Sequence, residues 1–143
     1  VVHDPLAREA MGGISGNAGL FTTAEDLARY AMMLLSGGAV DGVRVLSPAC
    51  CNLLFSTPEG EAYASRTLAW ERLSSGFNGA GVLVAEGSTL YHTGATGTSI
   101  VIDQDHDLAI IILTNRTAGL GTGADIHNLR ARINAIVSAS LRD

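Results

Sequence analysis

Lysine is absent from this sequence of 143 residues, and all nine basic side chains are arginines. The absence excludes three kinds of chemistry within the chain: a phosphate-binding loop built on lysine, a Schiff base, and a serine nucleophile activated by lysine. Fourteen acidic residues give a formal charge of −5, which argues against nucleic acid or an anionic membrane surface as the main partner. The use of arginine, alanine and glycine in place of lysine is typical of a GC-rich bacterial genome.

The sequence has only two cysteines and no long hydrophobic run. Cys50 and Cys51 are adjacent, so they cannot join distant parts of the chain, and they lack the further ligands of a zinc site. The longest uninterrupted apolar run is the six residues 108–113, far below the roughly 18 that a membrane span needs. We therefore expect no metal, no cofactor and no membrane span, in a chain long enough for one domain.

The first half of the chain predicts two helices after a glycine-rich loop over 1–21. A capping box at Thr22 or Thr23 starts the first helix, which carries an apolar face and ends at Gly37-Gly38. Ser47-Pro48 begins the second helix, because serine is a favoured N-cap and proline suits the first helical position.

The second half predicts an antiparallel sheet and a terminal helix. We expect strands over 67–73, 81–86, 99–103 and 108–114, the last two forming a hairpin. The unbroken apolar run of the last strand indicates a central strand buried on both faces. The terminal helix carries its apolar residues on one side: Ile126, Leu129, Ile133, Ile136, Val137 and Leu141. Helices followed by an antiparallel sheet with a covering helix define an α+β fold.

Three aspartates between the last two strands resemble the start of a calcium-binding loop. Asp103, Asp105 and Asp107 alternate as the early ligands of such a loop do. The later positions that need glycine and a carboxylate hold Leu108 and Thr114 instead. A plain hairpin turn is therefore the favoured interpretation.

The remaining candidate site is the glycine-rich stretch 91–99 ahead of the hairpin. A His-Thr-Gly tripeptide alone is a weak signal that an ordinary strand connection would explain, but other blocks accompany it in order. These blocks are the loop into a helix over 12–30, Leu68-Ala69-Trp70, His92-Thr93-Gly94-Ala95-Thr96-Gly97, and Leu113-Thr114-Asn115-Arg116. Together they resemble the serine β-lactamase and penicillin-binding-protein superfamily, nearest to class C β-lactamase-related esterases and D-peptidases.

The resemblance covers only the C-terminal part of such a hydrolase. The family's nucleophile lies in a Ser-x-x-Lys motif, followed by a Tyr-x-Asn motif, and neither occurs in this sequence. The resemblance therefore implies a β-lactamase/transpeptidase-like fragment, one incomplete domain. Residues 1–62 would belong to the helical subdomain and 63–143 to the α/β subdomain.

The resemblance also implies roles for residues of the third motif. His92 would take the place of the usual cationic lysine, and the backbone N–H of Ala95 would form half of an oxyanion hole. Substrate-binding positions would be Thr93, Gly94, Thr96, Asn115 and Arg116. Packing is an alternative for Thr93, and strand-end capping is an alternative for Asn115 and Arg116. Because histidine changes charge near neutral pH, we expect an esterase or D-peptidase more than an efficient β-lactamase.

Two functional hypotheses follow. The first is the C-terminal segment of an acyl-serine hydrolase acting on ester, amide or peptidoglycan-like substrates, inactive alone and partnered by a missing N-terminal half or by self-association. The second is a non-catalytic module that binds peptidoglycan or protein and keeps a remnant of the hydrolase fold. For localisation, both the cell envelope and the cytoplasm stay open.

Overall fold

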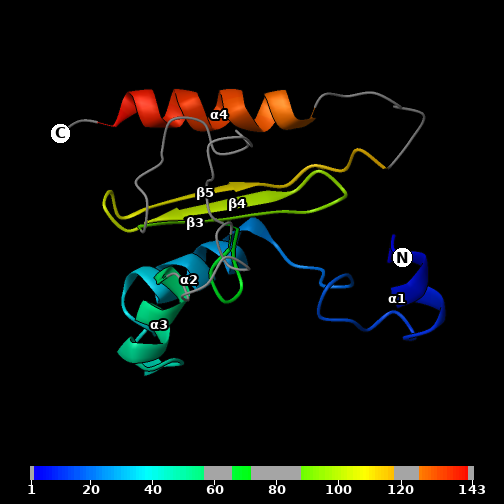
Figure 1. Ribbon diagram of the computed structural model, residues 1–143, viewed down its shortest axis with the longest axis horizontal. Helices are drawn as coiled ribbons and strands as arrows, with labels where there is room; N and C mark the ends of the chain where they lie inside the picture. Colours follow the sequence, from blue (N-terminus) through cyan, green and yellow to red (C-terminus); the bar gives the residue numbers. More distant parts are fainter. Residues whose placement is uncertain (1, 57–65, 72–87, 118–125, 142–143) are drawn as a thin grey trace.

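The computed structural model describes residues 2–56, 66–71, 88–117 and 126–141 (Figure 1). The elements in chain order are α1 (Pro5–Glu9), α2 (Ala24–Leu35), β1 (Ala39–Val40), β2 (Val43–Arg44), α3 (Pro48–Phe55), β3 (Thr89–Thr93), β4 (Ser99–Asp103), β5 (Leu108–Ile112) and α4 (Ile126–Ser140). The expected strand over 81–86 and the expected subdomain boundary between residues 62 and 63 lie outside the described residues.

The three longer strands form an antiparallel sheet with the order β3-β4-β5. Helix α4 covers one face of this sheet, and α2 and α3 lie on the other face (Figure 1). The short strands β1 and β2 form a separate hairpin between α2 and α3. The expected α+β fold, with a terminal helix over an antiparallel sheet, is confirmed.

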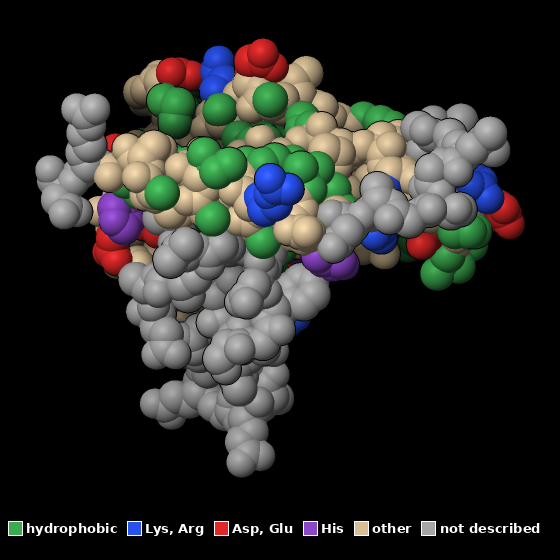
Figure 2. Space-filling model, turned by 90° about the horizontal axis from the view of Figure 1, so that it is seen from above, with side chains coloured by type: hydrophobic (Ala, Val, Ile, Leu, Met, Phe, Trp, Pro, Cys, Tyr) green, Lys and Arg blue, Asp and Glu red, His purple; other side chains and the backbone are tan. Residues whose placement is uncertain are grey.

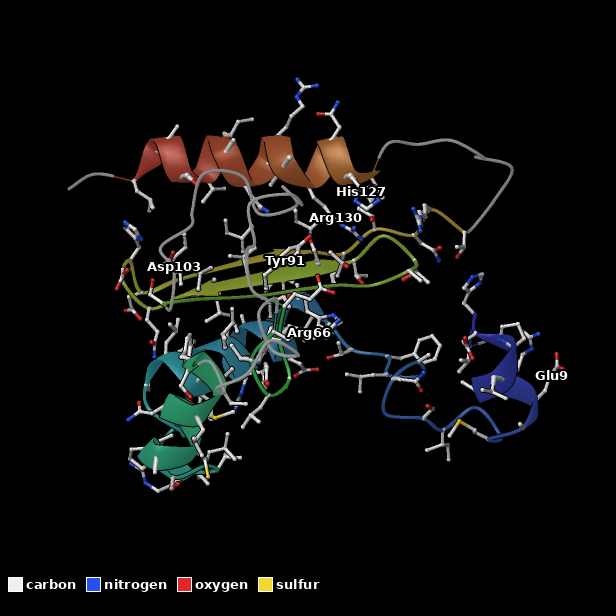
Figure 3. All side chains as sticks on the ribbon, in the orientation of Figure 1. Glu9, Arg66, Tyr91, Asp103, His127 and Arg130 are labelled. Atoms are coloured by element: carbon white, nitrogen blue, oxygen red, sulfur yellow. The ribbon has the colours of Figure 1, made fainter. Side chains whose placement is uncertain are left out.

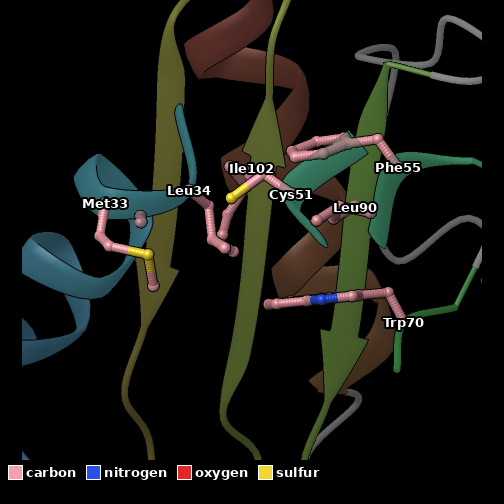
Figure 4. Close-up of a cluster of buried hydrophobic side chains, with 8 residues drawn as sticks. Met33, Leu34, Cys51, Phe55, Trp70, Leu90 and Ile102 are labelled. Atoms are coloured by element: carbon pink, nitrogen blue, oxygen red, sulfur yellow. The ribbon is translucent and has the colours of Figure 1, made fainter. Parts of the chain in front are cut away.

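Each face of the sheet has its own hydrophobic cluster, because successive side chains of a strand point to opposite faces. Towards α2 and α3, Leu90 and Ile102 pack with the helix residues Leu34 and Phe55 (Figure 4). Trp70 belongs to the same cluster and is buried. Towards α4, the buried members are Tyr91, Val101, Ile110 and Ile112.

The structure decides how the helices begin. Thr23 is the N-cap of α2, and its Oγ1 accepts a hydrogen bond of 3.2 Å from Asp26 N–H, so the cap lies at the second of the two candidate positions. Ser47 caps α3 in the same way, with 3.1 Å between its Oγ and Cys50 N. Both helices confirm the expected starts to within two residues.

The expectation of a loop over 1–21 is wrong for the segment that forms α1. Asp4 is the N-cap of this helix, and its Oδ1 accepts a hydrogen bond of 2.7 Å from Ala7 N–H, with Pro5 at the first position. This is the same pairing of a short polar cap with proline that begins α3. The cap at Asp4 and the proline at the first position therefore determine the local structure here, ahead of the glycines that follow.

The expected strand over 67–73 is not a strand in its described part. Residues 66–71 form a tight turn in which Thr67 N–H donates to Trp70 O at 3.0 Å. Only isolated bridges join Arg66 to Glu71 and Glu71 to Tyr91. The turn directs Trp70 into the core and lets Glu71 pair with β3.

Two expectations about burial need correction. Strand β5 is the edge strand of the described sheet, and β4 occupies the centre. On α4, Leu129 and Ile136 are 45% and 68% exposed, whereas the polar residues Arg130 and Asn134 are buried. Apolar side chains are therefore exposed on the α4 face of the molecule, seen from above in Figure 2.

Within the described residues, no helix has the length and hydrophobicity to span a membrane.

Gly38 and Gly42 offer a matched test of the backbone between α2 and α3. Both have positive φ, +96° and +76°. A Cβ on Gly38 would collide with the carbonyl of Leu46, whereas one on Gly42 would meet no atom within 4 Å. We expect Gly38→Ala to lower the free energy of unfolding by about 3 kcal/mol and Gly42→Ala by about 1 kcal/mol.

Urea denaturation followed by circular dichroism measures both changes. Equal losses in the two variants would contradict the close approach of Gly38 to the segment before α3.

Candidate active site

The candidate site is the turn of residues 94–98, which joins β3 to β4. Gly94 N–H donates to Thr98 O at 2.8 Å, and Gly97 N–H donates to Gly94 O at 3.0 Å. Gly97 has φ +112°, and a Cβ at this position would collide with Thr114 Oγ1. A Cβ on Gly94 would collide with the Thr98 hydroxyl. Both glycines are therefore required for the close packing of the turn.

The segment after β5 holds the far side of this turn. Arg116 Nε donates to Ala95 O at 2.7 Å, and Arg116 N–H donates to Thr96 O at 2.8 Å. Thr114 Oγ1 donates to Gly97 O at 2.8 Å. The block 113–116 that accompanies the third motif in the sequence thus lies directly against that motif.

Arg130 of α4 holds the same turn from within the protein (Figure 3). Its side chain is 2% exposed. Its Nη2 donates to Gly94 O at 3.0 Å and to Thr98 O at 2.7 Å, and its Nε donates to Gly97 O at 3.3 Å. Sequence analysis missed this residue. The available signal was its spacing, because Arg130 follows Ile126 by four residues and precedes Ile133 by three, which puts it on the apolar face of the helix.

Burial and neighbouring charged groups shift the pKa of Arg130 in both directions. Burial lowers the pKa of the Arg130 guanidinium, and the nearby Arg116 lowers it further, while Tyr91 and Glu71 raise it. Burial likewise raises the pKa of the Tyr91 phenol. The Tyr91 hydroxyl is buried and has no hydrogen-bond partner within the described part of the chain. Arg130 therefore keeps its charge in the interior mainly through hydrogen bonds to backbone carbonyls.

Ala95 is exposed at the tip of the turn. Its N–H makes no hydrogen bond within the described residues, whereas its carbonyl is held by Arg116. The preceding carbonyl, that of Gly94, is held by Arg130. Within the described residues the Ala95 N–H is therefore an unbonded backbone donor on an exposed residue, and a donor of this kind can stabilise a developing oxyanion.

His92 is half-buried in β3, and its Nδ1 lies 2.9 Å from Thr93 O. Because a carbonyl oxygen only accepts hydrogen bonds, Nδ1 carries the hydrogen, and Nε2 is the acceptor of the neutral ring. Alternation along β3 places the His92 side chain on the face of α2 and Thr93 on the face of α4. The two residues of the motif are therefore not brought to one face.

The Asn115 side chain forms hydrogen bonds within its own segment, to Thr117. Its Oδ1 accepts hydrogen bonds from Thr117 N–H at 3.0 Å and Thr117 Oγ1 at 2.8 Å. Arg116 bonds to the turn through Ala95. In this structure both side chains make the strand-end contacts that sequence analysis gave as the alternative to substrate binding. Thr96 lies half-buried in the turn, where its carbonyl accepts from Arg116.

The Asp103 carboxylate stabilises the turn that joins β4 to β5. Asp103 is 1% exposed, and its Oδ1 accepts from the backbone N–H groups of Asp105 and His106 at 2.9 and 3.1 Å. Its Oδ2 accepts from Thr89 Oγ1 at 3.0 Å. Within the described ranges, no three histidine, cysteine or acidic residues group as metal ligands would. The antiparallel pairing of β4 with β5 confirms the hairpin turn that the sequence favours.

Comparison with known proteins identifies the family of the chain. The Beta-lactamase family model matches residues 1–135. A protein of Escherichia coli O157:H7 named "Putative D-alanyl-D-alanine carboxypeptidase" is 36% identical over 121 residues, and a protein of Salmonella typhi with the same name is 33% identical over 117 residues. Each alignment covers 80% of this chain and 26% of the relative.

The chain therefore belongs to the beta-lactamase family, as its motifs indicate. It spans about a quarter of the length of the curated relatives that it matches. The chain is thereby related to the hydrolases of this family.

Asn115 provides a test of its capping role, which rests on its hydrogen bonds to Thr117. Asn115→Asp keeps the Oδ1 acceptor and removes the amide donor, whereas Asn115→Ala removes both. If Asn115 caps the strand end, the alanine variant loses about 0.5–1.5 kcal/mol of stability and the aspartate variant stays near the wild type. Urea denaturation measures both, and equal losses would contradict the capping role.

Proposed function

We propose that this chain forms the third-motif side of an acyl-serine hydrolase active site that acts on esters, amides or peptides ending in D-amino acids. The observation that carries the proposal is the Ala95 N–H, which belongs to an exposed residue and makes no hydrogen bond within the described residues, while the carbonyls of Gly94 and Ala95 are held by arginines. In an acyl transfer, a serine attacks the substrate carbonyl, and negative charge develops on the carbonyl oxygen. A fixed N–H aimed at that oxygen stabilises the transition state without reorganisation.

His92 acts in this proposal as the polar side chain of the motif. With Nδ1 donating to Thr93 O, its neutral ring offers Nε2 as a hydrogen-bond acceptor. When the ring is protonated, Nε2 becomes a donor that can contact a substrate carboxylate or a proton-shuttling hydroxyl. Thr93, Gly94 and Thr96 line the same strand end and turn, where they support the position of the substrate.

The chain supplies neither the nucleophile nor its base in this proposal. Lysine is absent, so the Ser-x-x-Lys motif of the family cannot be formed by these residues. We propose that a further part of the protein supplies it, and that the 143 residues are inactive alone. The exposed side chains of Leu129 and Ile136 are consistent with a chain that is covered by an additional segment or by another copy.

The first experiment tests activity of the chain itself. The purified 143-residue chain is incubated with a fluorophosphonate and, separately, with a penicillin, and its intact mass and ester hydrolysis are measured. We expect no adduct and no turnover, because the lysine-activated serine is absent. A complete serine hydrolase of this family, treated in parallel, controls for active reagents.

A stoichiometric serine adduct with turnover would overturn the proposed division of the active site. Tight binding of D-alanine-terminated peptides without any adduct or activity, even when the remainder of the protein is present, would instead support a non-catalytic binding module.

The second experiment tests the backbone donor in the longer protein that carries this chain. Ala95→Pro removes the N–H, and we expect kcat to fall about 100-fold or more, as for loss of an oxyanion donor. Ala95→Ser keeps the N–H and serves as the matched control, with kcat near the wild type. Similar kcat values for the proline variant and the wild type would contradict the oxyanion role.

A further inference from the structure

We propose that Arg130 is a positioning residue for the oxyanion site: its buried guanidinium fixes and polarises the Gly94–Ala95 peptide that presents the Ala95 N–H. The inference rests on the function proposed above for this turn. It assigns a role to a residue that lies on α4, outside every motif that the sequence analysis used.

The geometry of one peptide group links Arg130 to the donor. The carbonyl of Gly94 and the N–H of Ala95 belong to the same planar trans peptide, so they point in opposite directions. Arg130 Nη2 donates to Gly94 O at 3.0 Å. A contact that fixes the oxygen end of this peptide therefore also fixes the direction of the N–H at its other end.

The remaining bonds of Arg130 prevent the turn from rotating as a unit. Its Nη2 also binds Thr98 O at 2.7 Å, and its Nε lies 3.3 Å from Gly97 O. The contacted carbonyls thus lie on both sides of the tip of the turn. The planar fork of arginine can reach several acceptors at once, which the single ammonium of lysine does poorly.

The charge of Arg130 adds a second effect. A cation that donates to a carbonyl draws electron density towards the oxygen, and the N–H of that peptide becomes a stronger donor. Arg130 is 2% exposed, so water screens this effect little. Within the described residues no carboxylate lies within salt-bridge distance of Arg130, so its hydrogen bonds are directed to the turn.

A purely structural role would use Arg130 only to attach α4 to the sheet. In that case replacing Arg130 by an apolar residue would lower the free energy of unfolding, because its hydrogen bonds to the carbonyls of the turn would be lost. The two roles differ in what they predict: attachment affects stability alone, whereas positioning affects the Ala95 amide and the rate of the chemical step.

The first test uses nuclear magnetic resonance on the 143-residue chain. In Arg130→Met we expect the Ala95 amide proton to shift upfield and its ¹⁵N–{¹H} NOE to fall, because the peptide is neither polarised nor held. Arg130→Lys, which keeps the cation without the fork, is expected to give a smaller upfield shift than Arg130→Met. Arg132→Met, an exposed change on the same helix, is the matched control.

The second test measures kinetics in the longer protein that carries this chain. We expect kcat of Arg130→Met to fall about 100-fold while KM changes less than threefold, because a misplaced oxyanion donor acts on the transition state. Arg130→Lys should recover part of kcat, and Arg132→Met should match the wild type.

The outcomes separate this inference from the function on which it rests. An unchanged Ala95 amide in Arg130→Met, or an unchanged kcat in an active enzyme, would overturn the positioning role. If the wild-type protein hydrolyses no acyl substrate, the proposed function fails, and the amide shift alone decides whether Arg130 fixes the turn. If Arg130→Met does not fold, the same measurements on Arg130→Lys decide the question.

Discussion

The arrangement of the candidate site depends on the hydrogen bonds between the buried Arg130 guanidinium and the backbone carbonyls of the turn. The guanidinium lies between α4 and the sheet and binds the carbonyls of the turn that joins β3 to β4. A buried charge is tolerated only where its donors find acceptors. The turn supplies those acceptors, so the position of the helix and the conformation of the turn determine each other.

The sheet can carry a functional turn because both of its faces are packed. Val101 of the central strand β4 faces α4, and Ile102 faces α2 and α3. With the strand fixed from both sides, Arg116 and Thr114 hold carbonyls at one end of the sheet. The turn is therefore held in two ways: the core packs the strand on both faces, and Thr114 and Arg116 bind carbonyls of the turn.

Most of the chemistry proposed here belongs to the backbone. The proposed donor is the N–H of Ala95, and the side chains of Arg116 and Arg130 act on neighbouring carbonyls. A function of this kind places weak demands on side-chain identity at the tip of the turn and strong demands on glycine and arginine around it. This explains why the recognisable motif is rich in glycine, while the residues that hold it are spread along the sequence.

The sequence by itself determined the fold class, the hairpin after the third motif and the starts of α2 and α3, because capping residues, glycines and hydrophobic periodicity are local signals. It also determined the family, because the motif blocks follow one another in the family's order. Only the tertiary structure decided that β5 is an edge of the described sheet, and that on α4 the side chain of Arg130 is buried while that of Leu129 is exposed. These features depend on partners distant in the chain: an apolar run does not specify its neighbours, and an arginine in a helix is buried only where a turn elsewhere offers carbonyls to bind it.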